Sequence, residues 1–161
     1  MRTTLALVIV ILVALLTGCG SDDAQGPQGP VPVGQTVIVE HPGGKKGVVT
    51  VLSADWETTA AKDSQFGFDP NKGAYLVLDI EWSGEGPYNP LYLTFKNEAG
   101  NEYESFSGAA SGYEPSLHSG RLSGDDDKAR GFVVFNAPQG AGKLTVTNRR
   151  HQPAGSWTIP G

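Results

Sequence analysis

Three consecutive carboxylates, Asp125, Asp126 and Asp127, are the first candidate for a chemical site in the 161-residue sequence. Carboxylate oxygens are the ligands that calcium prefers, and Gly124 precedes the run. An EF-hand-like loop, however, places its ligands at alternate positions and ends in a glutamate, and that spacing is missing here. Consecutive side chains also need special backbone geometry to point at one ion. The pattern favours a solvated acidic turn, with calcium binding as the alternative.

The three histidines, His41, His118 and His151, lie far apart in the sequence, and no two form a close-spaced pair. A copper or zinc site would therefore have to be assembled by the fold. The only methionine is Met1, and the only cysteine lies in the N-terminal segment. We expect histidines in surface loops, and we assign no metal ligand and no cofactor.

Ser116 and His118 are two positions apart, so on a strand both side chains would face the same side. A nucleophilic serine also needs a base within hydrogen-bond reach, a group that orients the base and an oxyanion hole. The sequence contains no Gly-x-Ser-x-Gly and no Ser-x-x-Lys motif. We therefore assign no catalytic residue and predict that the protein is not an enzyme.

Two tyrosines, Tyr88 in "GPYNP" and Tyr113 in "SGYEP", lie in predicted loops. Loop tyrosines give a large rigid contact area with a polar tip, which suits an interaction surface. The alternative is that both rings lie across the rim of the fold as ordinary turn residues.

Cys19 follows a segment that has the order of a signal peptide. Arg2 supplies a positive charge, and Leu5 to Leu16 form an apolar run of 12 residues. A membrane-spanning helix needs about 20 apolar residues, so the run fits the apolar region of a signal peptide better than a span. A short membrane anchor or a buried core helix is the alternative.

The four residues Leu16-Thr17-Gly18-Cys19 resemble a bacterial lipobox. The resemblance implies that signal peptidase II cleaves between Gly18 and Cys19 and that Cys19 carries the lipid. Two or more acyl chains give stable anchoring, at about 0.8 kcal/mol per buried methylene. We therefore expect a lipid-anchored protein on the extracytoplasmic face of the cell membrane. The processed chain would have no cysteine available for a disulfide.

Composition divides the chain into three parts: a signal peptide over residues 1–18, the lipidated Cys19 with a flexible Gly/Pro-rich tether over 19–34, and one domain over 35–161. The formal net charge is −5, and no basic cluster occurs. We therefore expect neither nucleic acid nor an anionic membrane surface to be a partner of the domain.

The domain is predicted to be all-β, because Gly (22) and Pro (11) are abundant and long amphipathic helical patterns are absent. In the strand over 74–82, Leu76, Leu78, Ile80 and Trp82 form one wholly apolar face, as packing against a second sheet requires. A polar loop is predicted over 57–73. The other predicted strands are 36–40, 48–56, two strands around a turn at 98–101, 131–137, 143–148 and 156–160. This pattern indicates a β-sandwich, with a small closed barrel as the alternative.

The order of these segments resembles a family of immunoglobulin-like secreted antigens and lipoproteins of Gram-positive bacteria, especially actinobacteria. That family is related to the mycobacterial immunoprotective extracellular protein. The resemblance is carried by "VGQTV", "VVTVLSADW", "GAYLVLDIEWSGEG", "LTFKNEAGNEY" and "GDDDKARGFVVFNAPQG". Trp82-Ser83 departs from the family pattern, and residues 108–120 do not align with it. The resemblance implies an immunoglobulin-like antiparallel β-sandwich outside the cell and implies no activity.

Taken together, these features lead us to expect a membrane-anchored lipoprotein that acts as a non-enzymatic binding or interaction module, with an envelope protein as its possible partner. A metal- or small-solute-binding lipoprotein is the first alternative, and a cell-wall hydrolase is the second.

Overall fold

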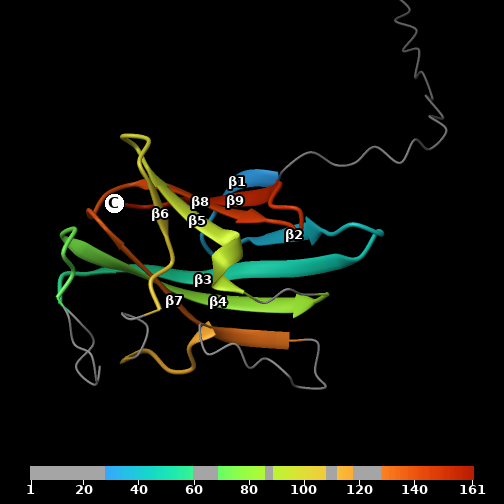
Figure 1. Ribbon diagram of the computed structural model, residues 1–161, viewed down its shortest axis with the longest axis horizontal. Helices are drawn as coiled ribbons and strands as arrows, with labels where there is room; N and C mark the ends of the chain where they lie inside the picture. The colour runs from blue at the N-terminus through green and yellow to red at the C-terminus, as the bar shows by residue number, and fades with distance from the viewer. Residues whose placement is uncertain (1–27, 60–68, 86–88, 108–111, 118–127) are drawn as a thin grey trace, which may run out of the picture.

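The computed structural model describes residues 28–59, 69–85, 89–107, 112–117 and 128–161. These residues form nine β-strands in two sheets that lie face to face as two layers (Figure 1). The strands are β1 (Gln28–Pro32), β2 (Thr36–Glu40), β3 (Lys46–Glu57), β4 (Ala74–Gly84), β5 (Leu93–Asn97), β6 (Glu102–Glu104), β7 (Lys128–Ala137), β8 (Gly142–Thr147) and β9 (Pro153–Ile159), with one 3-10 turn, η1 (Pro90–Tyr92), before β5. None of the described segments is a helix long and apolar enough to cross a membrane.

The first sheet has the order β1-β9-β8-β5-β6, and the second has the order β2-β3-β4-β7. All pairs are antiparallel except β1 with β9. Two separate sheets make a sandwich and not a closed barrel, which confirms the predicted architecture. The strand predicted over 36–40 has the same bounds as β2, whereas β7 and β9 each begin three residues earlier than predicted.

The tether prediction is wrong over residues 28–34, because β1 is a strand of the first sheet. Val31 lies opposite Trp157 of β9 in a parallel pair. Strand β1 is at the edge of its sheet. Proline has no backbone N–H, and an edge strand tolerates this on the side that has no neighbouring strand. Val31 and Val33 also pack against the core. The domain therefore includes residues 28–34 and does not begin at Gln35.

The core lies between the two sheets. Leu76, Leu78, Ile80 and Trp82 of β4 are all at most 1% exposed, as the alternation predicts. They belong to one apolar cluster with Phe95, Leu144 and Trp157 of the first sheet. The indole N–H of Trp157 donates to the Gln35 carbonyl at 2.8 Å, so this core side chain has a partner for its one polar group.

A second, smaller cluster covers part of the outer face of the second sheet. Tyr75 and Val77 of β4 and Val134 of β7 are buried there, and Tyr113 and Phe132 pack against them. The segment 112–117 holds this cluster in place by running along the edge of β7. The Phe132 N–H donates to the Pro115 carbonyl at 2.8 Å, and Leu117 reaches into the main core.

Strand β6 connects the two layers, and this crossing creates the site described next (Figure 1). Glu104 pairs with Thr94 of β5, but Ser105 already forms a bridge with Phe135 of β7. The Phe106 N–H then donates to the Val134 carbonyl at 2.7 Å. The chain therefore leaves the first sheet and joins the edge of the second within three residues.

Candidate binding groove

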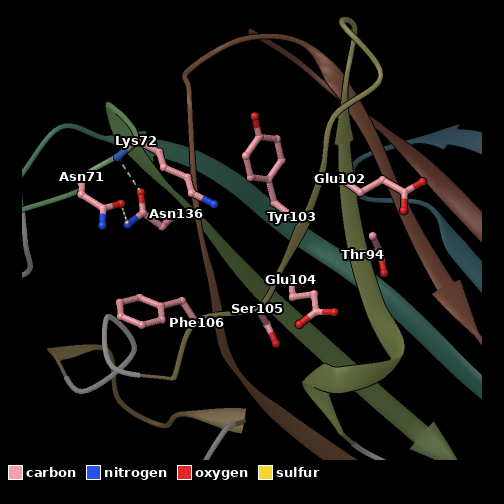
Figure 2. A pocket seen from close by; sticks show the side chains of 9 residues that line it. All are labelled: Asn71, Lys72, Thr94, Glu102, Tyr103, Glu104, Ser105, Phe106 and Asn136. Carbon is pink, nitrogen blue, oxygen red and sulfur yellow. Dashed lines mark hydrogen bonds between the residues drawn. The ribbon is translucent and has the colours of Figure 1, made fainter.

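An open groove of about 590 Å³ lies where β6 leaves β5 and approaches β7 (Figure 2). Its lining combines amides, hydroxyls, two carboxylates, one ammonium and two aromatic rings. The lining residues are Asn71, Lys72, Thr94, Glu102, Tyr103, Glu104, Ser105, Phe106 and Asn136.

The β5–β6 hairpin positions one wall of the groove. Gly100 has a φ of 86°, which favours glycine, and its N–H donates to the Asn97 carbonyl at 2.9 Å. The Asn97 N–H donates to the Asn101 carbonyl at 3.0 Å. Hydrogen-bonded pairs alternate in an antiparallel ladder, so Tyr103 exchanges its main-chain bonds with Phe95. The N–H groups of Glu102 and Glu104 therefore point away from β5.

Side chains alternate along the same strand. Glu102 and Glu104 share one face, and Tyr103 and Ser105 share the other. The Tyr103 ring stacks on Phe95 with 6.0 Å between the ring centroids, which fixes it against the core. The hydroxyl of Ser105 is buried and has no hydrogen-bond partner among the described residues. Phe106 is 40% exposed beside it.

The opposite wall consists of two asparagines that orient each other. Asn136 of β7 accepts a hydrogen bond from the main-chain N–H of Lys72 at 3.1 Å. Its amide N–H₂ donates to the side-chain oxygen of Asn71 at 2.9 Å. These two bonds fix both amide planes, and no described residue accepts a hydrogen bond from the N–H₂ group of Asn71. Within the described part of the chain, this N–H₂ group of the wall is a donor without an acceptor.

Charges in the groove are only partly compensated. Glu102 forms an ion pair with Lys96 at 3.2 Å. The Lys72 ammonium instead lies 5.0 Å from the centroid of the Tyr103 ring, in a cation–π contact. Within the part of the chain that the structure describes, neither Lys72 nor Glu104 forms an ion pair. Among the described residues, therefore, one cation and one anion of the groove have no ion-pair partner.

The chemical groups that line the groove can make several kinds of non-covalent contact. The site offers hydrogen-bond donors, two opposite charges and aromatic surface, all held on strands or on a loop fixed to a strand.

Of the two predicted interaction tyrosines, only Tyr113 is within the described residues. Its ring packs on Phe132 with 5.8 Å between the centroids, and its hydroxyl donates to the carboxylate of Glu57. Burial, and then the Glu57 carboxylate, raise the pKa of Tyr113 well above its usual range. Tyr113 therefore stays protonated, and part of its ring is used in packing the outer cluster.

The other predicted site residues lie outside the described residues. They are Gly18, Cys19, Tyr88, His118 and the run Asp125, Asp126 and Asp127. Ser116 forms an isolated bridge with Phe132 at the edge of β7, but its suggested partner His118 is not described.

His41 is not the surface-loop histidine that we expected, because only 4% of it is exposed. Its Nε2 donates to the Glu85 carbonyl at 3.2 Å, while its Nδ1 is buried without a partner among the described residues. Burial is the main cause of a lowered pKa for His41. His151 lies in another turn, stacked on Tyr92 with 5.3 Å between the ring centroids. Across the described ranges, no group of three or more His, Cys, Asp or Glu side chains is placed to hold a metal ion.

Sequence reasoning missed the groove because its residues come from three separate segments: 71–72, 94–106 and 136. The turn at 98–101 was predicted, and it did locate the hairpin that forms one wall. No pattern in the sequence linked that hairpin to Lys72 or Asn136.

No family model matches the chain, and no curated protein matches it. Among solved structures, the chain is similar to the 1.5 Å crystal structure of MPT63, a secreted protein from Mycobacterium tuberculosis. The two share a TM-score of 0.60 and 14% sequence identity over 84% of this chain and 99% of that chain. At this identity the likeness concerns the fold, and it agrees with the expected similarity to a mycobacterial protein. The chain therefore has the immunoglobulin-like β-sandwich fold of MPT63.

Proposed function

We propose that the protein is a lipid-anchored, extracytoplasmic lipoprotein whose β-sandwich is a non-enzymatic binding module, with the groove between β6 and β7 as its binding site. One observation carries this proposal: Lys72 and Glu104 line a single groove, and neither forms an ion pair with a described residue. Both side chains are exposed, so they are hydrated and accessible to a charged ligand.

The location rests on separate support. The sequence "LTGC" ending at Cys19 resembles a lipobox directly after an apolar run of 12 residues. The similar structure MPT63 is a secreted protein. Both are consistent with export, and the lipobox adds the anchor.

Anchoring is tested by replacing the lipidated residue. We expect Cys19→Ala to leave the unprocessed precursor and to block incorporation of a radiolabelled or alkyne-tagged fatty acid. The matched control is Ser21→Ala, which lies outside the lipobox and should be processed and labelled normally. Continued labelling of Cys19→Ala would rule out Cys19 as the lipid site.

Binding through the groove is tested with a photo-crosslinking amino acid placed in the full-length protein in living cells. Position 106 is suitable because Phe106 is 40% exposed at the groove. Position 52 is the matched control, since Leu52 is 38% exposed on β3 and outside the groove. We expect a discrete crosslinked product from position 106 and none from position 52. Equal crosslinking from both positions, or from neither, would contradict the groove as the binding site.

A further inference from the structure

We propose that the groove binds a short peptide with a free carboxylate at one end and a cationic group at the other. This inference rests on the groove being the binding site, and it specifies the class of ligand. It comes from the order of chemical groups along the groove: an ammonium, then main-chain groups of β6, then a carboxylate.

The anionic end of the ligand is assigned to Lys72 and Asn71. In Figure 2 the Lys72 ammonium extends toward Tyr103 from the wall that carries Asn71 and Asn136. The contact with the aromatic face leaves the N–H donors of Lys72 available, and the Asn71 N–H₂ is a second donor held in place through Asn136. A carboxylate accepts several hydrogen bonds at once, and such charge-assisted bonds are the strong ones.

The cationic end is assigned to Glu104. Its carboxylate has no ion-pair partner among the described residues, unlike that of Glu102, which Lys96 neutralises. Figure 2 shows Glu104 on the other side of the β6 chain from Lys72, near Thr94. A ligand that uses both charges therefore has to pass the edge of β6.

Main-chain groups lie between these two charges. The outward N–H groups of Glu102 and Glu104 follow from the alternation of the β5–β6 ladder. The hydroxyl of Ser105, which is buried without a described partner, is close by. Amide groups of a peptide match such donors and acceptors, so a peptide suits the middle of the groove as well as its ends.

Other ligand classes fit less well. A neutral sugar could use the amides and aromatic rings but would gain nothing from either charge, because Lys72 and Glu104 are exposed and hydrated. A ligand with one charge would use only one of these two charged side chains. The volume of about 590 Å³ is within the ordinary range for small-ligand sites and suits a few residues.

The experiment is a calorimetric titration of the full-length, processed protein in detergent micelles with four probes. These are tetra-alanine with free ends, N-acetyl-tetra-alanine, tetra-alanine amide and maltotriose. We expect binding of the free peptide, and a loss of about tenfold in affinity for each capped form, because each cap removes one charge-assisted contact. Equal affinity for free and capped peptides, or binding of maltotriose alone, would overturn the proposal.

Two charge-neutralising variants test which end of the peptide contacts which charged side chain of the groove. With Lys72→Gln, the free peptide and its C-terminal amide should bind equally well, and with Glu104→Gln the free and N-acetylated peptides should bind equally well. The matched control is Lys143→Gln, since Lys143 is exposed on β8 and outside this groove. A similar loss with Lys143→Gln would mean general electrostatic attraction and would overturn the assignment.

The proposed function and the ligand class fail in different ways. Specific crosslinking at position 106 without any preference for the free peptide overturns the peptide class and leaves the groove as a binding site. Absence of both crosslinking and peptide binding overturns both proposals.

Discussion

At the scale of single residues, His41 shows how burial sets the protonation state of a side chain. The Glu85 carbonyl can only accept a hydrogen bond, so Nε2 carries the proton. The buried Nδ1 is therefore unprotonated. Protonating Nδ1 would place a charge in a site with little water. Burial is the largest cause of the lowered pKa of His41, and Arg149 lowers it further, while the Glu85 carbonyl partly opposes both.

This protonation state predicts a dependence of stability on pH. The pKa of His41 is below 6.5 in the folded protein, so the unfolded chain binds the proton more readily. Stability from this residue is therefore complete above pH 6.5 and is lost as the pH falls through the folded-state pKa. We expect the melting temperature of the wild type to fall more steeply between pH 7 and pH 5 than that of His41→Gln.

Glutamine keeps a donor for the Glu85 carbonyl and does not titrate. All other titrating groups are the same in both proteins, so a difference between the two pH slopes comes from His41. His151→Gln is the matched control, because His151 is exposed. It should keep the slope of the wild type. Identical slopes for wild type and His41→Gln would show that the burial of His41 does not control the pH dependence.

At the scale of elements, the segment 112–117 can pair with β7 only because residue 131 is a glycine. A Cβ on Gly131 would lie 2.5 Å from the Pro115 carbonyl oxygen and 3.2 Å from Cγ of Leu117. That carbonyl accepts the Phe132 N–H, and Leu117 is buried in the main core. A methyl group at this position would push the segment away from the strand edge.

We therefore expect Gly131→Ala to lower the free energy of unfolding by about 1–3 kcal/mol, the range typical of an overpacked site. Urea denaturation measures this change. Lys128→Ala on the same strand is the control, since it removes only an exposed ion pair with Glu81 and should cost less than about 1 kcal/mol. If Gly131→Ala unfolds at the same urea concentration as the wild type, the segment is not held against β7 in solution.

At the scale of the whole molecule, alternation of apolar residues was enough to predict the two-layer fold. The apolar face of β4 and the bounds of β2 follow from side-chain periodicity, which is a local property. Strand β1 was missed because Gly29, Pro30 and Pro32 resemble a linker, and only pairing with distant β9 makes them a strand. The groove was missed for the same reason, since contacts between distant segments leave no periodic signal.

The position of β1 also changes how far the domain can be from the membrane. If Cys19 carries the lipid, nine residue steps of about 3.4 Å separate it from Gln28 of β1, which gives a reach of about 30 Å at most. A tether that ended at Gln35 would reach about 54 Å by the same estimate. Strand β1 is then within about 30 Å of the lipid, and β6 with the groove is at the opposite edge of the same sheet.

Limited proteolysis of the lipidated protein tests this shorter tether. A protease of broad specificity should release a folded fragment whose N-terminus lies before Gln28, because residues 28–32 are paired with β9. Mass spectrometry of the fragment identifies its first residue, and a melting curve checks that it is folded. Val31→Asp places a carboxylate in the half-buried position of Val31 beside the core. In that variant the first cleavage should move to a position after residue 32. A wild-type fragment that begins after Val33 and is still folded would show that β1 is dispensable and that the tether is the longer one.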